Sequence, residues 1–343
     1  MNAALIGLGM VASTYGSALR ASCLVDLKTA FAPSLESQER FICTFPDVCA
    51  RIAKDVQQIA DDPDVDFAIV TTPPNARREI VEILAYAGKP ILMEKPVERT
   101  LQAATELVVL CEDLNVPLGI MLQHRARPVV QALRDRLDDL GALIAVEVAV
   151  PWWRPQAYYD EPGRGSFARD GGGVLISQAI HTLDLMQSLA GPVAEVTAMS
   201  STTAFHSMES EDFVSAGLGF ANGAVGHFFA TTASFPGSGE TLTLHCQNGS
   251  ARLAAGALRL DFQSGQSEQI GTVASSGGGA DPMAFTSDWH QTVIEDFAQA
   301  LIDKRPPMVT GRDALGVHAL IAALETSGRT GERVSVLGAN QCR

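Results

Sequence analysis

The first third of the chain alternates short apolar runs with segments of helical periodicity. The apolar runs are continuous rather than alternating, which is typical of strands buried on both faces of a sheet. They lie at residues 3–6, 28–32, 67–70, 91–93 and 118–121, and the helical segments lie at 11–21, 75–87 and 101–114. Strands that alternate with helices in this way predict an α/β fold with a doubly wound, parallel sheet.

The pattern changes after residue 123. Helices are expected at 128–140 and 174–189, with a strand at 143–150 between them. From 193 to 262 strands follow one another, and Asn-Gly pairs at 222–223 and 248–249 mark hairpin turns. Consecutive strands predict an α+β domain with a large, mostly antiparallel sheet. The remaining segments are a glycine-rich loop at 275–279 and helices at 287–304 and 312–327.

At 343 residues the chain is long for a single hydrophobic core, so two domains are expected. The change of pattern places the boundary after residue 123. The first domain, at 1–123, carries the parallel sheet. The second, at 124–343, carries the antiparallel sheet, and its last helices can pack back on the first domain.

Composition removes several classes of function. The formal net charge of −14 argues against a nucleic-acid partner, because neutralising phosphates needs a basic surface. None of the six cysteines has C-x-x-C spacing and no Cys/His cluster resembles a metal site, so reduced thiols and no metal are expected. The N-terminus has no basic run before an apolar core, and no apolar stretch approaches the roughly 20 residues of a membrane helix. A cytoplasmic protein without membrane contact is therefore expected.

The first predicted strand runs into Gly7-Leu8-Gly9-Met10-Val11-Ala12, a G-x-G-x-x-A fingerprint placed between a strand and a helix. Gly7 permits the tight turn, Gly9 lets the backbone approach a pyrophosphate, and Ala12 allows close helix packing. The N–H groups at the start of the helix then face the phosphates. The motif predicts a Rossmann-type dinucleotide site that includes Gly7, Gly9, Met10 and Val11.

The end of the second predicted strand lacks the carboxylate that would bind a ribose 2′-hydroxyl and repel a 2′-phosphate. We place that position near Ala32, which is followed by Ser34 and Arg40. Ser34 and Arg40 are candidates for holding a 2′-phosphate. Shape alone can also hold the adenosine end, so the choice between NAD and NADP stays open.

Other strand ends carry residues suited to a ligand, because doubly wound sheets bind ligands at the carboxyl edge. The loop Thr71-Thr72-Pro73-Pro74-Asn75 is expected to line the nicotinamide side, and Asn75 can also cap the next helix. Glu94-Lys95-Pro96 places a lysine where an ammonium group can stabilise a developing alkoxide. The expected cofactor contacts on these ends are Thr71, Thr72, Pro73, Asn75, Glu94 and Lys95.

These motifs, in this order, resemble the glucose–fructose oxidoreductase, inositol dehydrogenase and MocA (Gfo/Idh/MocA) family. The resemblance continues in Gly171-Gly172-Gly173-Val174-Leu175-Ile176-Ser177-Gln178-Ala179-Ile180-His181-Thr182-Leu183-Asp184. The segment from Trp152-Trp153-Arg154-Pro155 through Tyr158-Tyr159 to Gly163-Arg164-Gly165 looks like a subgroup similar to UDP-N-acetylglucosaminuronate 3-dehydrogenases. The resemblance implies an NAD(P)-dependent oxidoreductase that acts on a CH–OH group of a sugar or cyclic polyol.

The resemblance also implies roles for single residues. Lys95 would contact the reacting hydroxyl, and His181 would be the general acid/base that takes its proton. Asp184, one helical turn after His181, can orient the imidazole or bind a substrate hydroxyl. Many members carry Asp where this chain has Ser177, and many carry His where it has Arg77. The expected substrate contacts are Gln123, Trp153, Arg154, Tyr159, Arg164, Ser177, Gln178 and Asp184.

The aromatic and basic loop after residue 151 offers stacking faces for a sugar ring and guanidinium groups for a carboxylate or phosphate. Its arginines favour an anionic substrate such as a uronic acid or a nucleotide sugar. His124, Arg125 and Arg127, just after the last parallel strand, can also reach a substrate. The alternative is that the aromatic loop packs at a domain or subunit interface.

Three functions compete on this evidence. The first is a sugar dehydrogenase or reductase, and the second is a redox-neutral enzyme whose bound cofactor is reduced and then reoxidised. The third is a non-catalytic sensor of the same fold that binds NAD(P) or a sugar. The presence of both Lys95 and His181 favours an enzyme. In relatives the C-terminal sheet pairs subunits, so a homodimer or homotetramer through that sheet is expected.

Overall fold

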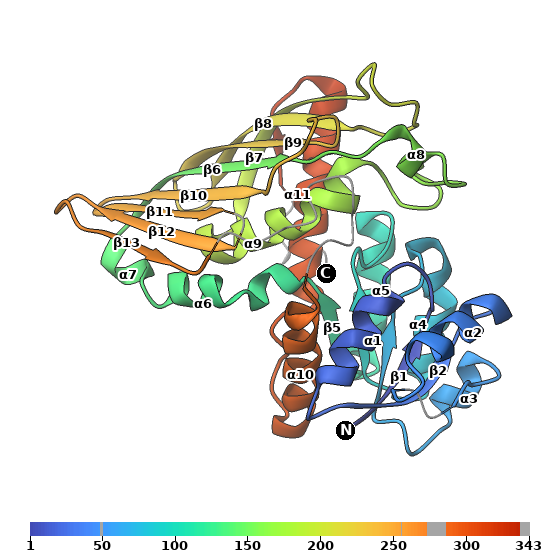
Figure 1. The fold of residues 1–343 in the computed structure, drawn as a ribbon. Coiled ribbons are helices and arrows are strands. Elements are labelled where there is room, and N and C mark those ends of the chain that lie inside the picture. The colour runs from blue at the N-terminus through green and yellow to red at the C-terminus, as the bar shows by residue number, and fades with distance from the viewer. Residues whose placement is uncertain (49–50, 255, 273–285, 337–343) are drawn as a thin grey trace. The chain divides into compact units, whose positions relative to one another are not determined.

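The computed structural model describes residues 1–48, 51–254, 256–272 and 286–336. These residues form two compact units (Figure 1). The first unit comprises Met1–Gln123 and Thr286–Leu315, and the second comprises the described residues of His124–Phe285 and Gly316–Arg343. Helix α11 (Gly311–Thr330) contributes residues to both units.

The first unit contains a five-stranded parallel sheet in the order β2-β1-β3-β4-β5. Strands β3, β4 and β5 are buried at every residue, which explains their unbroken apolar sequences. The strand order reverses at β1, so ligands are expected beside the ends of β1 and β3. The predicted doubly wound sheet is confirmed, with β1 (Asn2–Ile6), β2 (Asp26–Phe31), β3 (Phe67–Val70), β4 (Ile91–Glu94) and β5 (Leu118–Met121).

Helices pack around this sheet, and α10 comes from the distant C-terminal part of the chain. It packs on α1 and β5, where Gly119 leaves room for the ring of Phe297. The pattern left α2 and α3 unassigned, because α2 buries Phe41 among mostly polar neighbours and α3 is very short. The helices of this unit are α1 (Ala12–Ala21), α2 (Leu35–Thr44), α3 (Val56–Ala60), α4 (Arg77–Tyr86), α5 (Leu101–Asp113) and α10 (Asp288–Asp303).

The second unit is built on a nine-stranded sheet in the order β13-β12-β11-β10-β6-β9-β8-β7-β14. Neighbouring strands are antiparallel except β6 and β9, so the prediction of a large, mostly antiparallel sheet is confirmed. The Asn-Gly signals lie where expected, at the β8–β9 and β10–β11 hairpins. The strands are β6 (Leu143–Pro151), β7 (Val193–Ser201), β8 (Phe213–Phe220), β9 (Val225–Thr231), β10 (Thr241–Cys246), β11 (Gly249–Ala254), β12 (Ala257–Phe262), β13 (Ser267–Ile270) and β14 (Val334–Ser335).

Helices α6 (Pro128–Arg134), α7 (Leu137–Leu140) and α9 (Ile180–Ala190) pack on one face of this sheet (Figure 1). The prediction of a single helix at 128–140 is wrong. Helix α6 ends with Asp135 as its C-cap, and α7 begins after Arg136, its N-cap. The helix predicted at 174–189 is present, but it is not α-helical throughout. Its start, Leu175–Ala179, is a π-helical turn, η3, and α9 follows it directly.

A short helix, α8 (Gln156–Tyr159), lies in the predicted aromatic loop. The predicted glycine-rich loop at 275–279 lies outside the described residues. Within the described part of the chain, no helix combines the length and apolar character needed to cross a membrane.

Candidate functional site

The glycine loop of the first unit is shaped so tightly that a side chain at Gly7 would not fit. Gly7 has a φ of +104°, and a Cβ there would lie 2.9 Å from the backbone nitrogen of Thr72. The Thr71 hydroxyl donates to the Gly7 carbonyl at 2.7 Å, which ties the end of β1 to the end of β3. By contrast, a Cβ at Gly9 would meet no atom within 4 Å, so this part of the loop faces open space.

Helix α1 begins at Ala12 without a side-chain cap on its N-cap residue, Val11, and without an acidic residue in its first turn. Its first N–H groups therefore carry the partial positive charge of a helix start without a neutralising carboxylate. Met10 beside them is 47% exposed. A tight glycine turn, an open Gly9 and an uncapped helix start together fit a pyrophosphate, so the residues present suit a dinucleotide cofactor.

Ala32 follows β2 and is buried, and Ser34 comes at the start of α2. The Ser34 hydroxyl accepts a hydrogen bond from the Ser37 backbone N–H and caps α2. Ser34 therefore stabilises the start of this helix, independently of any contact with the cofactor. Arg40, six residues further along the chain in α2, donates to the Leu8 carbonyl of the glycine loop at 3.4 Å and to the Ser37 hydroxyl at 3.3 Å. A guanidinium group thus lies against the glycine loop.

The loop after β3 is partly buried. Thr71 and Thr72 are 8% and 9% exposed, and the Thr72 hydroxyl is buried without a hydrogen-bond partner among the described residues. Pro73 precedes a 3-10 turn, η1 (Pro74–Ala76). Capping of the next helix by Asn75 is wrong: Asn75 lies inside that turn, and the N-cap of α4 is Ala76 without a side-chain bond.

The buried guanidinium of Arg77 joins the loops after β3 and β4. Its Nε donates to the Thr72 carbonyl at 2.8 Å, and its Nη1 donates to the carbonyls of Glu94, at 2.5 Å, and Pro96. Burial lowers the pKa of Arg77 to about 10, and Glu94 is the foremost group opposing that shift. The side chain remains a cation at neutral pH and fixes the backbone on either side of Lys95.

Glu94, the last residue of β4, is buried and accepts a hydrogen bond from the Tyr15 hydroxyl at 3.2 Å. Burial raises the pKa of Glu94, and nearby Lys95 and Arg77 oppose that shift. Its side chain contacts the protein interior at Tyr15, so the predicted cofactor contact of Glu94 stays a prediction.

Lys95 follows β4 and is half-buried. Its charge opposes the rise in the pKa of Glu94, and burial together with the Lys95 charge lowers the pKa of His290 on α10 to about 3. The His290 ring also packs edge-on against Tyr15, with centroids 5.4 Å apart. A neutral His290 imidazole leaves Lys95 and Arg77 as the cations at this strand end.

In the second unit, the backbone before His181 is held by Glu211. The Glu211 carboxylate accepts from the N–H groups of Gly173, at 3.2 Å, and Leu175, at 3.1 Å, while its carbonyl accepts from Val174 at 2.9 Å. A Cβ on Gly173 would lie 1.8 Å from the Glu211 carbonyl oxygen. These hydrogen bonds hold the backbone of Gly173–Leu175 where the π-helical turn before α9 begins. Such turns are frequent at functional sites.

His181 lies in the first turn of α9, is 7% exposed and stacks on His124 with ring centroids 4.9 Å apart. Asp184 on the same helix is fully buried, and its carboxylate accepts from Arg125 Nε at 2.9 Å and Nη2 at 2.6 Å. Ser177 is half-buried within the π-helical turn, with its backbone N–H bonded to the Gly173 carbonyl. His181 and Asp184 therefore share a regular helix, but Ser177 does not.

Two predicted substrate contacts have buried amide oxygens. Gln123 and Gln178 are 6% and 4% exposed, and the Oε1 atom of each is buried without a partner among the described residues. Buried polar atoms are rarely left without a partner, so these amides suit contact with a polar ligand. Gln123 belongs to the first unit and Gln178 to the second.

The aromatic residues after β6 gather into a cluster with two more rings. The ring of half-buried Trp153 lies 4.6 Å from that of Phe205 and 5.2 Å from that of Phe235. Phe205 and Phe235 are 49% and 77% exposed. The sequence reasoning missed both phenylalanines, because isolated aromatic residues in turns carry no periodic signal.

The arginines of this region are engaged within the second unit. Arg154 is 2% exposed, donates to the Trp153 carbonyl at 2.7 Å and lies over the rings of Trp152 and Tyr158. Arg164 pairs with Glu161 and lies 4.3 Å above the Tyr158 ring. Neighbouring Arg169 pairs with the same glutamate at 2.9 Å. Their predicted contacts with an anionic substrate stay predictions.

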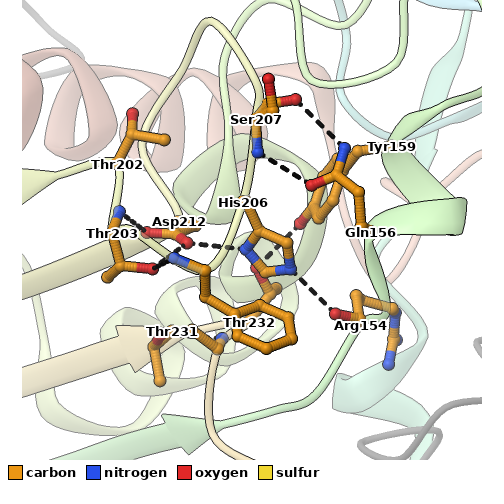
Figure 2. A network of polar contacts seen from close by, with 12 residues as sticks. Arg154, Gln156, Tyr159, Thr202, Thr203, His206, Ser207, Asp212, Thr231 and Thr232 are labelled. Atoms are coloured by element: carbon orange, nitrogen blue, oxygen red, sulfur yellow. Dashed lines mark hydrogen bonds and ion pairs between the residues drawn. The ribbon is translucent and has the colours of Figure 1, made fainter.

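Figure 2 shows the polar network that fixes this segment. His206 contacts the Asp212 carboxylate at 2.6 Å through Nδ1 and the Arg154 carbonyl at 2.9 Å through Nε2. The Tyr159 hydroxyl bonds to Thr232 at 2.8 Å, and burial raises the pKa of that phenol. The segment that carries Trp153 and Arg154 is thus tied to the β7–β8 connection, a link that sequence reasoning did not find.

No group of three or more His, Cys, Asp or Glu side chains in the described ranges is arranged to hold a metal ion.

The fold and the glycine loop define a nucleotide-binding oxidoreductase of two units. Residues 1–122 match the oxidoreductase family with an NAD-binding Rossmann fold, and residues 130–252 match the GFO/IDH/MocA C-terminal domain. The chain belongs to the Gfo/Idh/MocA family, as its motifs predicted.

Curated relatives agree with this membership, and solved structures share the fold. A 1,5-anhydro-D-fructose reductase from Ensifer adhaerens is 27% identical over 290 residues, covering 82% of this chain and 83% of the relative. A D-apiose dehydrogenase from Paraburkholderia graminis is 26% identical over 304 residues, covering 83% and 77%. A levoglucosan dehydrogenase in complex with NADH and levoglucosan has a TM-score of 0.86 at 22% identity, covering 98% of this chain and 99% of that one. The WlbA dehydrogenase from Bordetella pertussis, in complex with NADH and UDP-GlcNAcA, has a TM-score of 0.84 at 24% identity and covers 98% of both chains.

Proposed function

We propose that this oxidoreductase transfers hydride between the hydroxyl-bearing carbon of a sugar or cyclic polyol and NAD(P). The observation that carries the proposal is family membership across both units, combined with Lys95 directly after β4 and His181 in the first turn of α9. Relatives with known names act on 1,5-anhydro-D-fructose and D-apiose, which supports a carbohydrate substrate here.

The protein would hold the cofactor with residues of the first unit. The glycine turn and the uncapped start of α1 suit the pyrophosphate, and the buried Thr72 hydroxyl offers a polar group at the end of β3. The chemistry that a bound nicotinamide supplies is acceptance of two electrons from the C–H bond beside the reacting hydroxyl. Arg40 beside the glycine loop, together with the missing carboxylate near Ala32, favours acceptance of a 2′-phosphate.

Lys95 and His181 would handle the proton of that hydroxyl. The Lys95 ammonium would donate to the hydroxyl oxygen and stabilise the negative charge that grows on it. A neutral His181 would accept the proton, which suits an imidazole because its unperturbed pKa lies near neutrality. The proposal requires both side chains to reach one hydroxyl group of the bound substrate.

The aromatic cluster of Trp153, Phe205 and Phe235 would stack on the apolar face of a sugar ring. Gln123 and Gln178 have buried amide oxygens that would accept from substrate hydroxyls. If the substrate is anionic, we expect a uronic acid or a nucleotide sugar. The WlbA dehydrogenase binds such a compound, UDP-GlcNAcA.

We also propose that subunits pair through the outward face of the nine-stranded sheet. Met199 on β7 and Val225 on β9 alternate with the buried residues of their strands, and each is 60% exposed on the opposite face of the sheet. Light scattering of the purified protein tests the subunit pairing.

The described cysteines Cys23, Cys43, Cys111 and Cys246 are free thiols, which supports a reducing compartment such as the cytoplasm.

The test of the enzymatic proposal is cofactor reduction by the purified full chain. Pentoses, hexoses, anhydrosugars, inositols, uronic acids and UDP-sugars are offered with NAD⁺ or NADP⁺, and absorbance of the reduced nicotinamide is followed. Lys95→Met and His181→Gln should each lower kcat/KM by about 100-fold or more, while cofactor affinity changes little. Lys54→Met and His227→Gln, at exposed positions, are the matched controls. Wild-type turnover in either site variant would reject the assigned roles.

A further inference from the structure

We propose that His124 is a positioning residue for His181. In this proposal Arg127 locks His124 as a neutral imidazole with its proton on Nδ1, and that uncharged ring supports the His181 ring. The inference rests on the proposed role of His181 as the acid/base. It adds a residue that acts on the histidine rather than on the substrate.

The two rings are neighbours within the second unit. Their centroids are 4.9 Å apart, and the ring planes are inclined by 30°, which is a stacked arrangement. Both side chains are buried, His124 in the turn after β5 and His181 at the start of α9. The face of one ring therefore forms part of the immediate surroundings of the other.

The contact between Arg127 and His124 determines which nitrogen of His124 carries the proton. Arg127 Nη2 lies 2.6 Å from His124 Nε2. A guanidinium group has only donors, so Nε2 must be the acceptor and must keep its lone pair. In a neutral imidazole the proton then lies on Nδ1. Protonating Nε2 would set one N–H group against another at this distance.

Glu240 balances the charge of Arg127. The Glu240 carboxylate accepts from the same Nη2 atom at 2.6 Å, and both side chains are buried. A second, largely buried ion pair joins Arg125 to Asp184 of α9 at 2.6 Å, and the charge of Arg134 acts on both members of that pair. The ring stack thus has largely buried ion pairs nearby, and the guanidinium of Arg127 donates to both Glu240 and His124.

A neutral partner ring matters when His181 gains a proton. The resulting imidazolium would lie over the electron-rich face of an uncharged aromatic ring, an arrangement that favours a cation. A second imidazolium at this distance would instead disfavour the charged form of His181 and lower its pKa. Holding His124 neutral therefore leaves His181 as the titrating member of the pair.

Histidine ¹⁵N chemical shifts report the tautomer directly. The full chain is labelled at its seven histidines, and the His124 signals are assigned by their loss in His124→Gln. Between about pH 5 and 8 we expect His124 to keep a protonated Nδ1 and an unprotonated Nε2, while His181 titrates. A proton on Nε2 of His124, or a doubly protonated His124 at neutral pH, would overturn the proposal.

A double variant tests the cause of this state. Arg127→Met with Glu240→Gln removes the donor and its buried counter-charge together, so that neither charge is left without its partner. We expect His124 to become titratable and the midpoint of His181 to fall by about half a pH unit or more. Arg136→Met with Glu268→Gln removes a more exposed ion pair of the same unit and should change neither signal. His124 signals like those of the wild type in the first double variant would refute the assigned lock.

Enzyme kinetics supply a separate readout. If the proposed function holds, the acidic limb of the kcat/KM profile for sugar oxidation should move to lower pH in the Arg127/Glu240 variant, following the His181 midpoint. If no sugar is oxidised by the wild type, the proposed function fails. The ¹⁵N measurement still decides the state of His124 in that case, so the two failures are distinguishable.

Discussion

The backbone of Glu211 occupies the space that a side chain at Gly173 would need. A Cβ at Gly173 would lie 1.8 Å from the Glu211 carbonyl oxygen and 2.9 Å from its backbone nitrogen. The same glutamate accepts hydrogen bonds from the N–H groups of Gly173 and Leu175. The segment leading into the helix of His181 is therefore set by a residue on a different strand connection.

Replacing Gly173 by Ala should destabilise the protein by about 2 kcal/mol or more, because the new methyl group would overlap backbone atoms that have no free rotation. Denaturant unfolding of the full chain measures the change. Gly217→Ala is the matched control, since a Cβ there meets no atom within 4 Å. Equal unfolding midpoints for Gly173→Ala and the wild type would contradict this packing.

Arg77→Met should cost about 3 kcal/mol of stability, because the carbonyls of Thr72, Glu94 and Pro96 would lose a buried, charged donor. It should also lower kcat by weakening the support of Lys95. Neighbouring Arg78 is exposed and forms ion pairs with Glu82 and Glu106, so Arg78→Met should change stability by less than about 1 kcal/mol. Unfolding and steady-state rates of both variants check the contrast, and an equal effect at the two positions would speak against it.

Stability should depend on the protonation of Glu325, whose pKa is raised to about 8 by burial and by the nearby charge of Glu211. Because the folded pKa lies above the unfolded value, the folded state holds the proton more tightly. This stabilisation is complete below the unfolded pKa and is lost as the pH rises through about 8.

Glu325→Gln should therefore become more stable relative to the wild type as the pH rises from about 5 to about 8, by an amount on the order of 2 kcal/mol. Chemical unfolding at several pH values measures this difference. Glu332→Gln, at an exposed position on the segment after α11, serves as the control. A difference that stays constant across this range would show that Glu325 ionises normally in the folded state.

Arg40→Ala should weaken binding of NADPH by about tenfold and that of NADH much less. Arg40 lies against the glycine loop through the Leu8 carbonyl, where a guanidinium can pair with a 2′-phosphate. Quenching of nicotinamide fluorescence gives both dissociation constants. An equal loss for the two cofactors would indicate that Arg40 supports the loop rather than the phosphate.

Asp212→Asn should destabilise the protein by about 3 kcal/mol, because it removes the charged partner of fully buried His206. It should raise KM for the sugar while leaving cofactor affinity unchanged, since His206 holds the Arg154 backbone of the second unit. Glu209→Gln, exposed on the same connection, is the control. Chemical unfolding, cofactor titration and steady-state kinetics together check the prediction. An unchanged KM for the sugar would show that this network does not support substrate binding.

Much of the architecture followed from the sequence, and the particular misses have physical causes. The unbroken apolar runs of β3 and β4 reveal strands because every side chain is buried. Helix α2 went unassigned because its buried surface is small. The helix predicted at 174–189 begins as a π-helical turn, since Glu211, far along the chain, binds the backbone of Gly173 and Leu175.

The sequence by itself determined the parallel and antiparallel sheets, the glycine loop and the family, because each is encoded by residues close together along the chain. Only the tertiary structure decided the partners of the polar side chains. That Arg77 binds the carbonyls around Lys95, that Arg125 binds Asp184, and that His124 stacks on His181 follow from contacts between distant segments. Periodicity records which face of an element is buried, but it carries no information about which polar group lies opposite.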